Sequence, residues 1–163
     1  MSILETCQWL QDMPLATALR ESQYMFPVIE GTHLLGMALM MGPVMMLDLR
    51  LAGVLWKSEP ASKIRNLFLP ITFVGFALLI VTGSLLFWSE AVRCYKSKFF
   101  LMKVGLLVLA GLNALVFHRT VDRNIGAWDN DPTPPPRAKL AGVSSLVLWT
   151  LVITAGRYTA YNL

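Results

Sequence analysis

Residues 67–88 read LFLPITFVGFALLIVTGSLLFW, a stretch without a single charged side chain. At a rise of about 1.5 Å per residue, a helix of this length crosses the roughly 30 Å of hydrocarbon in a bilayer. Similar predominantly apolar runs lie at 25–47, 99–117 and 140–158. We therefore predict an all-α membrane protein, a four-helix transmembrane bundle in which residues 1–163 form a single integral membrane domain.

The overall composition agrees with a membrane environment. Of the 163 residues, 55% are hydrophobic and only 15% are charged, whereas soluble domains average about 25% charged residues. The net charge of +4 comes mainly from the connections between spans and forms no basic face or nucleic-acid-binding module. We expect membrane lipid as the surroundings and no nucleic acid as a partner.

The first 24 residues differ from the rest of the chain. Trp9, Leu10, Leu15 and Leu19 alternate with polar neighbours, a pattern typical of an amphipathic helix that lies on the membrane surface. Disorder is the alternative for segment 1–24. No apolar signal-peptide core precedes the first span, so we expect no cleaved leader.

The distribution of positive charge predicts the orientation. Eight Lys and Arg residues fall at the first and third connections between spans, against five on the opposite side. By the positive-inside rule, this asymmetry places both termini outside, in the periplasm of a bacterial inner membrane. The chain has two cysteines, Cys7 and Cys94, and both fall on the outer side. A disulfide and two free thiols are both open there.

The first span carries the clearest functional signal. Glu30 and His33 lie one helical turn apart in an otherwise apolar run. An ionisable residue at that depth costs about 2.5–3.5 kcal/mol on insertion scales unless it faces a partner, a cofactor or water. By helical rise, His33 lies roughly 12 Å below Met25, and Lys103 lies roughly 6 Å below Phe99. The sequence thus predicts a shared outer layer of polar residues.

Arg157, at the outer end of the fourth span, completes this predicted layer of Glu30, His33, Lys103 and Arg157. A neutral imidazole is a good axial ligand for haem iron, and cations near the surface can hold haem propionates. The sixth iron position would be open or filled by Met37, water or a partner. Two alternatives are a buried ionic network that fixes helix packing and a path for protons or ions.

A second polar layer, formed by Asp48, Asn113 and His118, lies deeper. His118 is roughly 28 Å below Phe99, so about 16 Å along the membrane normal separates it from His33. One iron cannot bind both histidines at that separation. We expect mainly structural roles here, with Asp48 and Arg50 as a helix-end pair. The functional alternative is a proton entry point between His118 and Asp48.

Methionines offer a different interpretation of the first span. His33, Met37, Met41 and Met45 recur every four residues, and thioether and imidazole groups suit Cu(I). A ladder of weak copper sites is therefore an alternative to haem. Methionine is also a common apolar filler, so a stripe at this spacing is more often core or lipid contact.

Four motifs resemble a bacterial family of four-helix membrane proteins without an assigned function: EGTHLLGMAL at 30–39, DLRLAG at 48–53, the spacing of Lys103, Asn113 and His118, and AGRYTAY at 155–161. More distantly, the early histidine followed by HLLGMA is similar to HemJ-type protoporphyrinogen oxidases and CopD-type copper proteins. The HemJ resemblance implies haem b binding, with His33 and Lys103 matching a first-helix histidine and a third-helix lysine that are important for activity.

Together these observations predict a cytochrome b-like, haem b-binding membrane protein that acts in electron transfer, alone or as the membrane subunit of a redox complex. The expected partners are a quinone or a periplasmic redox protein. We also expect an oligomer or a larger assembly. The alternatives are a CopD-like copper-handling protein and a cofactor-free structural subunit. Whether the chain is an enzyme stays open.

Overall fold

The computed structural model describes residues 2–161, except the side chain of residue 160. Within this range the chain forms helices and connecting turns, and four of the helices are long and apolar enough to cross a membrane. The elements in chain order are α1 (Ile3–Gln11), α2 (Pro14–Glu21), α3 (Met25–Leu51), α4 (Ala61–Ser89), α5 (Ala91–Lys96), α6 (Lys98–Thr120), the 3₁₀ helix η1 (Asp122–Ala127) and α7 (Pro136–Tyr161). The predicted all-α membrane fold is confirmed, and the protein is a multi-pass membrane protein.

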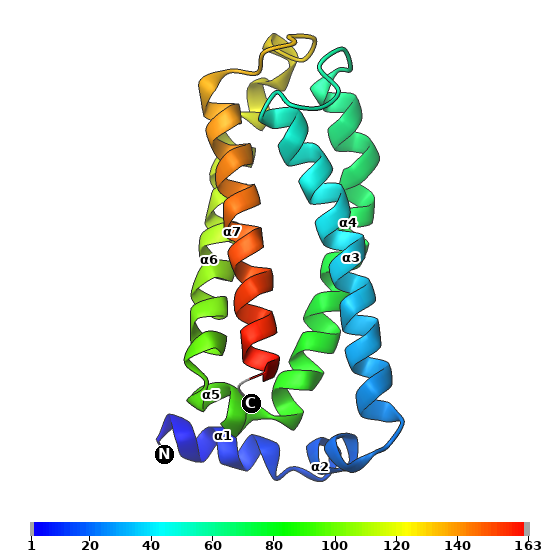
Figure 1. Ribbon diagram of the computed structural model, residues 1–163, viewed down its shortest axis with the longest axis vertical. Coiled ribbons are helices and arrows are strands. Elements are labelled where there is room, and N and C mark those ends of the chain that lie inside the picture. The colour runs from blue at the N-terminus through cyan, green and yellow to red at the C-terminus, as the bar shows by residue number, and fades with distance from the viewer. Residues whose placement is uncertain (1, 162–163) are drawn as a thin grey trace.

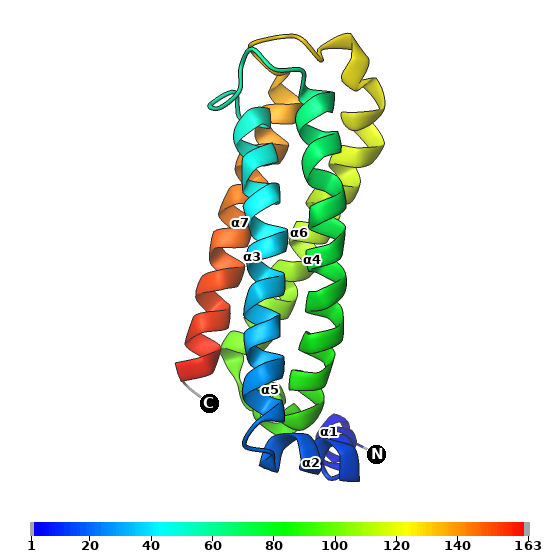
Figure 2. The ribbon, with the colours of Figure 1, turned by 90° about the vertical axis from the view of Figure 1, so that its right-hand side faces the viewer.

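The long helices form two antiparallel pairs (Figures 1 and 2). Helix α3 packs along α4, and α6 packs along α7, while α3 and α7 join the two pairs. We call the end that carries α1, α2 and α5 the outer end, and the end that carries η1 the inner end. The described ends of the chain both lie at the outer end (Figure 1).

Each long helix extends beyond the apolar run that predicted it. Helix α4 begins at Ala61 rather than residue 67, and α3 continues to Leu51 rather than residue 47. The reason is physical: an apolar run measures the length in contact with hydrocarbon, whereas a helix continues into the interface until its backbone finds other partners.

Glycines allow the closest contacts between helices. A Cβ on Gly75 of α4 would lie 2.5 Å from the backbone nitrogen of Met40 in α3. Likewise, a Cβ on Gly142 of α7 would lie 2.7 Å from the carbonyl oxygen of Asp48. Small residues at such crossings let backbones approach and supply the van der Waals packing that holds helices together in lipid.

The outward surfaces of the long helices are strongly apolar. Phe73 of α4 and Val108 of α6 are examples, with 62% and 57% of their surface exposed. In a soluble protein such a surface would be a liability, but here it matches the hydrocarbon that surrounds the spans.

The N-terminal segment forms a cover across the outer end, made of α1 and α2 (Figure 1). Residues 1–24 were predicted to hold one amphipathic element, and the structure contains two helices because Pro14 begins the second one. The Trp88 indole donates to the carbonyl of Leu10 at 2.8 Å. Arg20 donates to the carbonyl of Ser89 at 3.2 Å. These bonds fix the cover against the end of α4.

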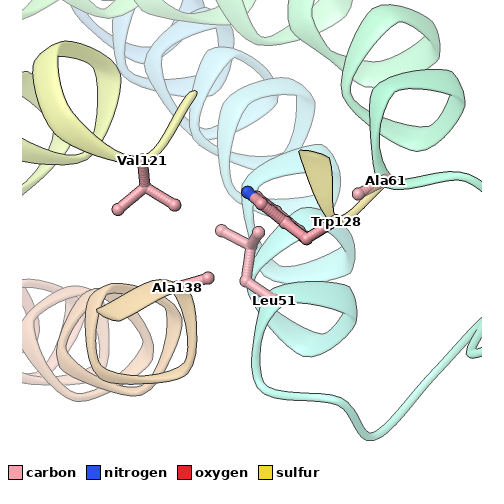
Figure 3. Packing of buried hydrophobic residues seen from close by; sticks show 5 residues of the cluster. All are labelled: Leu51, Ala61, Val121, Trp128 and Ala138. Carbon is pink, nitrogen blue, oxygen red and sulfur yellow. The ribbon is translucent and has the colours of Figure 1, made fainter. Parts of the chain in front are cut away.

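A small apolar cluster closes the inner end. Figure 3 shows its five members, which come from three helices, from the turn between α6 and η1, and from the connection after η1: Leu51, Ala61, Val121, Trp128 and Ala138. This cluster brings the α3–α4 connection and the α6–α7 connection together, and so determines where the polar residues of the inner end can lie.

Candidate functional site

His33 of α3 has a defined partner on α4. Its Nδ1 lies 2.8 Å from the hydroxyl oxygen of Thr82, and that hydroxyl lies 2.6 Å from the carbonyl oxygen of Leu78. A carbonyl can only accept, so the single hydroxyl proton of Thr82 goes to Leu78. His33 Nδ1 must then be the donor to Thr82. This assignment leaves Nε2 with a free lone pair, the form of imidazole that binds a metal.

The imidazole also packs directly against the α4 backbone. A Cβ on Gly83 would lie 3.2 Å from His33 Cε1. Thr82 is buried, with 5% of its surface exposed, and His33 is half-buried. Hydrogen bond and packing together hold the ring in one orientation, as the second-layer contacts of metal-binding histidines commonly do.

Lys103 of α6 completes the site from the other helix pair. Its half-buried side chain lies over Gly156 of α7, where an added Cβ would be 3.6 Å from Nζ. The ammonium lies close enough for its charge to act on His33. Among residues 2–161 no carboxylate forms an ion pair with Lys103. All four long helices therefore contribute to the site formed by His33, Thr82, Gly83, Lys103 and Gly156, here called the outer site.

The structure places the other predicted members of the outer layer differently. Glu30 is exposed and makes no hydrogen bond or ion pair with the described residues. Arg157 is exposed as well and donates to the hydroxyl of Tyr161 at 2.7 Å, with its guanidinium 4.5 Å from the centre of that ring. The contacts of the described residues therefore do not join Glu30 or Arg157 to His33 and Lys103, with which the sequence grouped them.

The inner layer separates into distinct contacts. Asn113 donates to the carbonyl of Ala141 at 3.0 Å and links α6 to α7. Asp48 is hydrogen-bonded to Ser145. His118 and Asp48, suggested together as a proton entry point, have different partners, because His118 Nδ1 lies 2.9 Å from a carboxylate oxygen of Asp122. Asp122 also forms an ion pair with Arg65 of α4.

The sequence suggested that Arg50 pairs with Asp48, but the two side chains do not pair. Residues two apart in a helix point in different directions. Its side chain is completely buried. It donates to the carbonyls of Glu59 at 3.0 Å, Asp131 at 3.1 Å and Asp129 at 3.4 Å. Arg50 thus joins the two inner connections.

Asp129 strengthens the same junction. Its carboxylate accepts hydrogen bonds from the backbone and the hydroxyl of Ser62, both at 2.7 Å, at the first turn of α4. Burial raises the pKa of the Asp129 carboxyl, but the bonds from Ser62 and the nearby charge of Arg50 outweigh it, so the pKa lies below its usual value. Asp129 therefore serves as a cap for α4.

Met41 and Met45 of the predicted methionine ladder face a different helix from His33. Met41 and Met45 line a small apolar groove of about 120 Å³ between α3 and α7, together with Leu146, Trp149, Thr150, Ile153 and Thr154. His33 instead faces α4. A four-residue repeat advances about 40° per step around a helix of 3.6 residues per turn, so the ladder rotates from one neighbouring helix to the next.

No group of three or more His, Cys, Asp or Glu side chains within residues 2–161 is arranged to hold a metal ion. A haem iron needs only one or two axial ligands from the protein.

Thr82, which orients His33, was not among the site residues predicted from the sequence. The helical rise that gave the depths of His33 and Lys103 could have found it, because Thr82 lies roughly 9 Å from Trp88 at the outer end of α4.

The fold and the outer site define a class: a four-span helical membrane protein with one oriented histidine in one helix pair and one half-buried lysine in the other. The chain belongs to a family of unknown function, DUF6644, whose model matches residues 25–162. No curated protein and no solved structure matches the chain.

Proposed function

We propose that this protein binds a b-type haem at the outer site and acts in electron transfer, with His33 as the axial ligand. The observation that carries the proposal is the hydrogen-bond chain from His33 through Thr82 to the carbonyl of Leu78. It fixes the tautomer in which Nε2 is free to coordinate. A histidine that served only to tie α3 to α4 would gain nothing from keeping that nitrogen unpaired in a membrane.

The charges near His33 fit the same ligand. Haem carries two anionic propionates, and Lys103 supplies a cation that no carboxylate of the described residues neutralises. Arg157 and Tyr161 offer further donors at the outer end of α7. When bound, the haem would supply one-electron redox chemistry. The chain's own residues would then hold the iron through His33, orient the imidazole through Thr82 and balance charge through Lys103.

Met37 does not fit as the second axial ligand. It lies one turn from His33 on the same helix, so both side chains would approach an iron from the same side. The proposed site would therefore hold the iron through one histidine of this chain, with water or a partner as any second ligand.

The decisive experiment compares the two histidines of the chain. Protein purified from membranes should show a Soret band and a reduced-state α-band. His33→Ala should abolish both bands, whereas the matched variant His118→Ala should keep them, because His118 lies at the inner end and contacts Asp122. Equal loss of the bands in both variants, or a colourless wild-type protein, would overturn the proposal.

Metal analysis of the same samples tests the copper alternative. Stoichiometric copper in a colourless protein would favour a CopD-like function that uses His33 and the ladder of Met37, Met41 and Met45. The geometry gives this alternative less support, because Met41 and Met45 face the groove on α7 and His33 faces α4. Protein without haem or copper would leave the structural-subunit alternative.

We place the protein in a bacterial inner membrane with its outer end in the periplasm, on the evidence of the Lys and Arg distribution. The outer site would then exchange electrons with a quinone or a periplasmic redox protein, alone or within a redox complex. A periplasm-dependent reporter fused after the last residue should be active, and a reporter that works only in the cytoplasm should not. The reverse pattern would invert the orientation.

A further inference from the structure

The two cysteines of the chain occur where the N-terminal cover meets the bundle. Cys7 lies on α1 and Cys94 on α5, and these two helices pack against each other. Both thiols are buried, with 6% and 7% of their residue surface exposed. Cys7 also lies near enough for its charge to influence Cys94. Helix packing therefore brings together two thiols that are far apart in the sequence.

Two hydrogen bonds hold the end of α1 that follows Cys7. The side chain of Gln11, at the end of α1, accepts from the backbone nitrogen of Val92 in α5 at 2.9 Å. The carbonyl of Leu10 accepts from the Trp88 indole. Both bonds tie the C-terminal end of α1 to residues that precede Cys94, and so keep the helix that carries Cys7 packed against the helix that carries Cys94.

We propose that Cys7 and Cys94 form a disulfide that fastens the α1–α2 cover to the outer end of the bundle. A disulfide of the surroundings, carried by a protein or a small thiol, would be the oxidant. The two thiols lose two protons and two electrons as their S–S bond forms, and the oxidant's S–S bond breaks to give two thiols. The inference rests on the proposed orientation, which puts this end in an oxidising compartment.

The surroundings of Cys94 suit a bond that is slow to open. Burial raises the pKa of the Cys94 thiol to about 11, and the charge of Glu90 acts in the same direction, while Lys103 and Arg93 oppose it. A thiol with a high pKa is a poor leaving group in thiol–disulfide exchange. Reduction that must expel Cys94 is therefore slow, as expected for a structural bond rather than a rapid switch.

The proposed disulfide lies close to the outer site. Lys103 acts on both Cys94 and His33, so the junction between cover and bundle lies beside the residues that would hold the haem. The family match begins at residue 25, so α1 and α2 lie outside the matched region. The disulfide would attach α1 covalently to α5, which lies within the matched region.

A peptide map tests the proposal directly. Trypsin cuts after Lys and Arg, so it leaves Cys7 in the peptide 1–20 and Cys94 in the tripeptide 94–96. Protein extracted without reductant, in excess alkylating agent, should yield these peptides as one linked species that separates on reduction. Cys7→Ser and Cys94→Ser should each lose the linked species and carry one alkyl group on the remaining thiol.

A second sample separates geometry from orientation. Folded wild-type protein is treated with oxidised glutathione before alkylation. A link in this sample alone would support the thiol pairing and contradict the periplasmic orientation. Two alkylated cysteines and no linked species in either sample would overturn the disulfide. His33→Ala should keep the link even where it loses the haem bands, so a failure of haem binding leaves this result unaffected.

Discussion

The two ends of the bundle contain similar polar residues but surround them differently. At the inner end, Arg50 donates to three carbonyls and Asp129 accepts twice from Ser62. At the outer site, His33 makes one side-chain hydrogen bond and Lys103 has no carboxylate partner among the described residues. Groups that satisfy one another stabilise a structure, whereas groups without a partner need another explanation, such as a water, an ion or a functional role.

The comparison is not absolute, because the inner end also has unpaired atoms. Arg50 Nη1 and Asp48 Oδ2 are buried without a hydrogen-bond partner among the described residues. The remaining nitrogens of Arg50 are bonded to two connections of the chain, however, so its main effect is on folding. The contrast predicts that inner-end variants lose stability, while outer-site variants keep the fold and lose ligand binding.

Arg50→Met should have the largest effect. It removes the donors for the carbonyls of Glu59, Asp129 and Asp131 in a place that water does not reach. Breaking such a buried charged network costs about 3–5 kcal/mol, which should show as a large fall in the thermal unfolding temperature of the purified protein in detergent. The exposed Arg123→Met is the control. Similar melting of the two variants would remove the contrast between the ends.

Asp129→Ala should have the next largest effect, because it removes both hydrogen bonds to Ser62 at the start of α4. Loss of such a cap costs about 1–2 kcal/mol. The pKa of Asp129 is lowered, so this stabilisation is present above the unfolded value near 3.9 and is lost as the pH falls through the folded value. Unfolding temperatures from pH 7 to pH 3 should therefore converge for wild type and variant.

The control for this experiment is Asp131→Ala, which keeps the backbone carbonyl that Arg50 uses. It should leave the difference between pH 7 and pH 3 close to that of the wild type. If Asp131→Ala behaves like Asp129→Ala, the acid sensitivity comes from general charge repulsion rather than from the cap.

Apolar length predicted the spans, and helical rise predicted a similar depth for His33 and Lys103, because both measure position along the membrane normal. The sequence did not predict which way Glu30 and Arg157 point. Rotation about a helix axis depends on packing, here on close contacts such as that of Gly75 with α3. The contacts of Arg50 could not be predicted from the sequence either. Its partners are backbone carbonyls in distant connections, and every residue type has such a carbonyl.

Thr82→Val tests the outer site with a smaller change. Valine has almost the same shape but cannot accept the proton of His33 Nδ1. Loss of such an orienting partner typically weakens metal binding by 10–100-fold, and we expect roughly a tenfold loss of haem affinity here, with little change in unfolding temperature. Thr72→Val, whose hydroxyl bonds only to the carbonyl of Phe68, is the matched control.

A second readout of Thr82→Val does not depend on haem. Nitrogen NMR of the His33 ring should show the Nδ1-protonated tautomer in the wild type and a mixture of tautomers in the variant. An unchanged ring spectrum would contradict the assigned direction of the hydrogen bond, whatever the result for haem.

Gly83→Ala should have the smallest effect on stability and addresses the packing of the imidazole. Alanine favours a helix over glycine by up to about 1 kcal/mol, so Gly111→Ala, whose added Cβ meets nothing within 4 Å, should be neutral or slightly stabilising. At Gly83 the added Cβ would press on His33 Cε1 at 3.2 Å and offset part of that gain.

Of the two variants, only Gly83→Ala should shift the proton resonances of the His33 ring. Identical stability and identical His33 resonances would mean that the imidazole is not held against α4, and the outer site would lose the preorganisation that distinguishes it from the inner end.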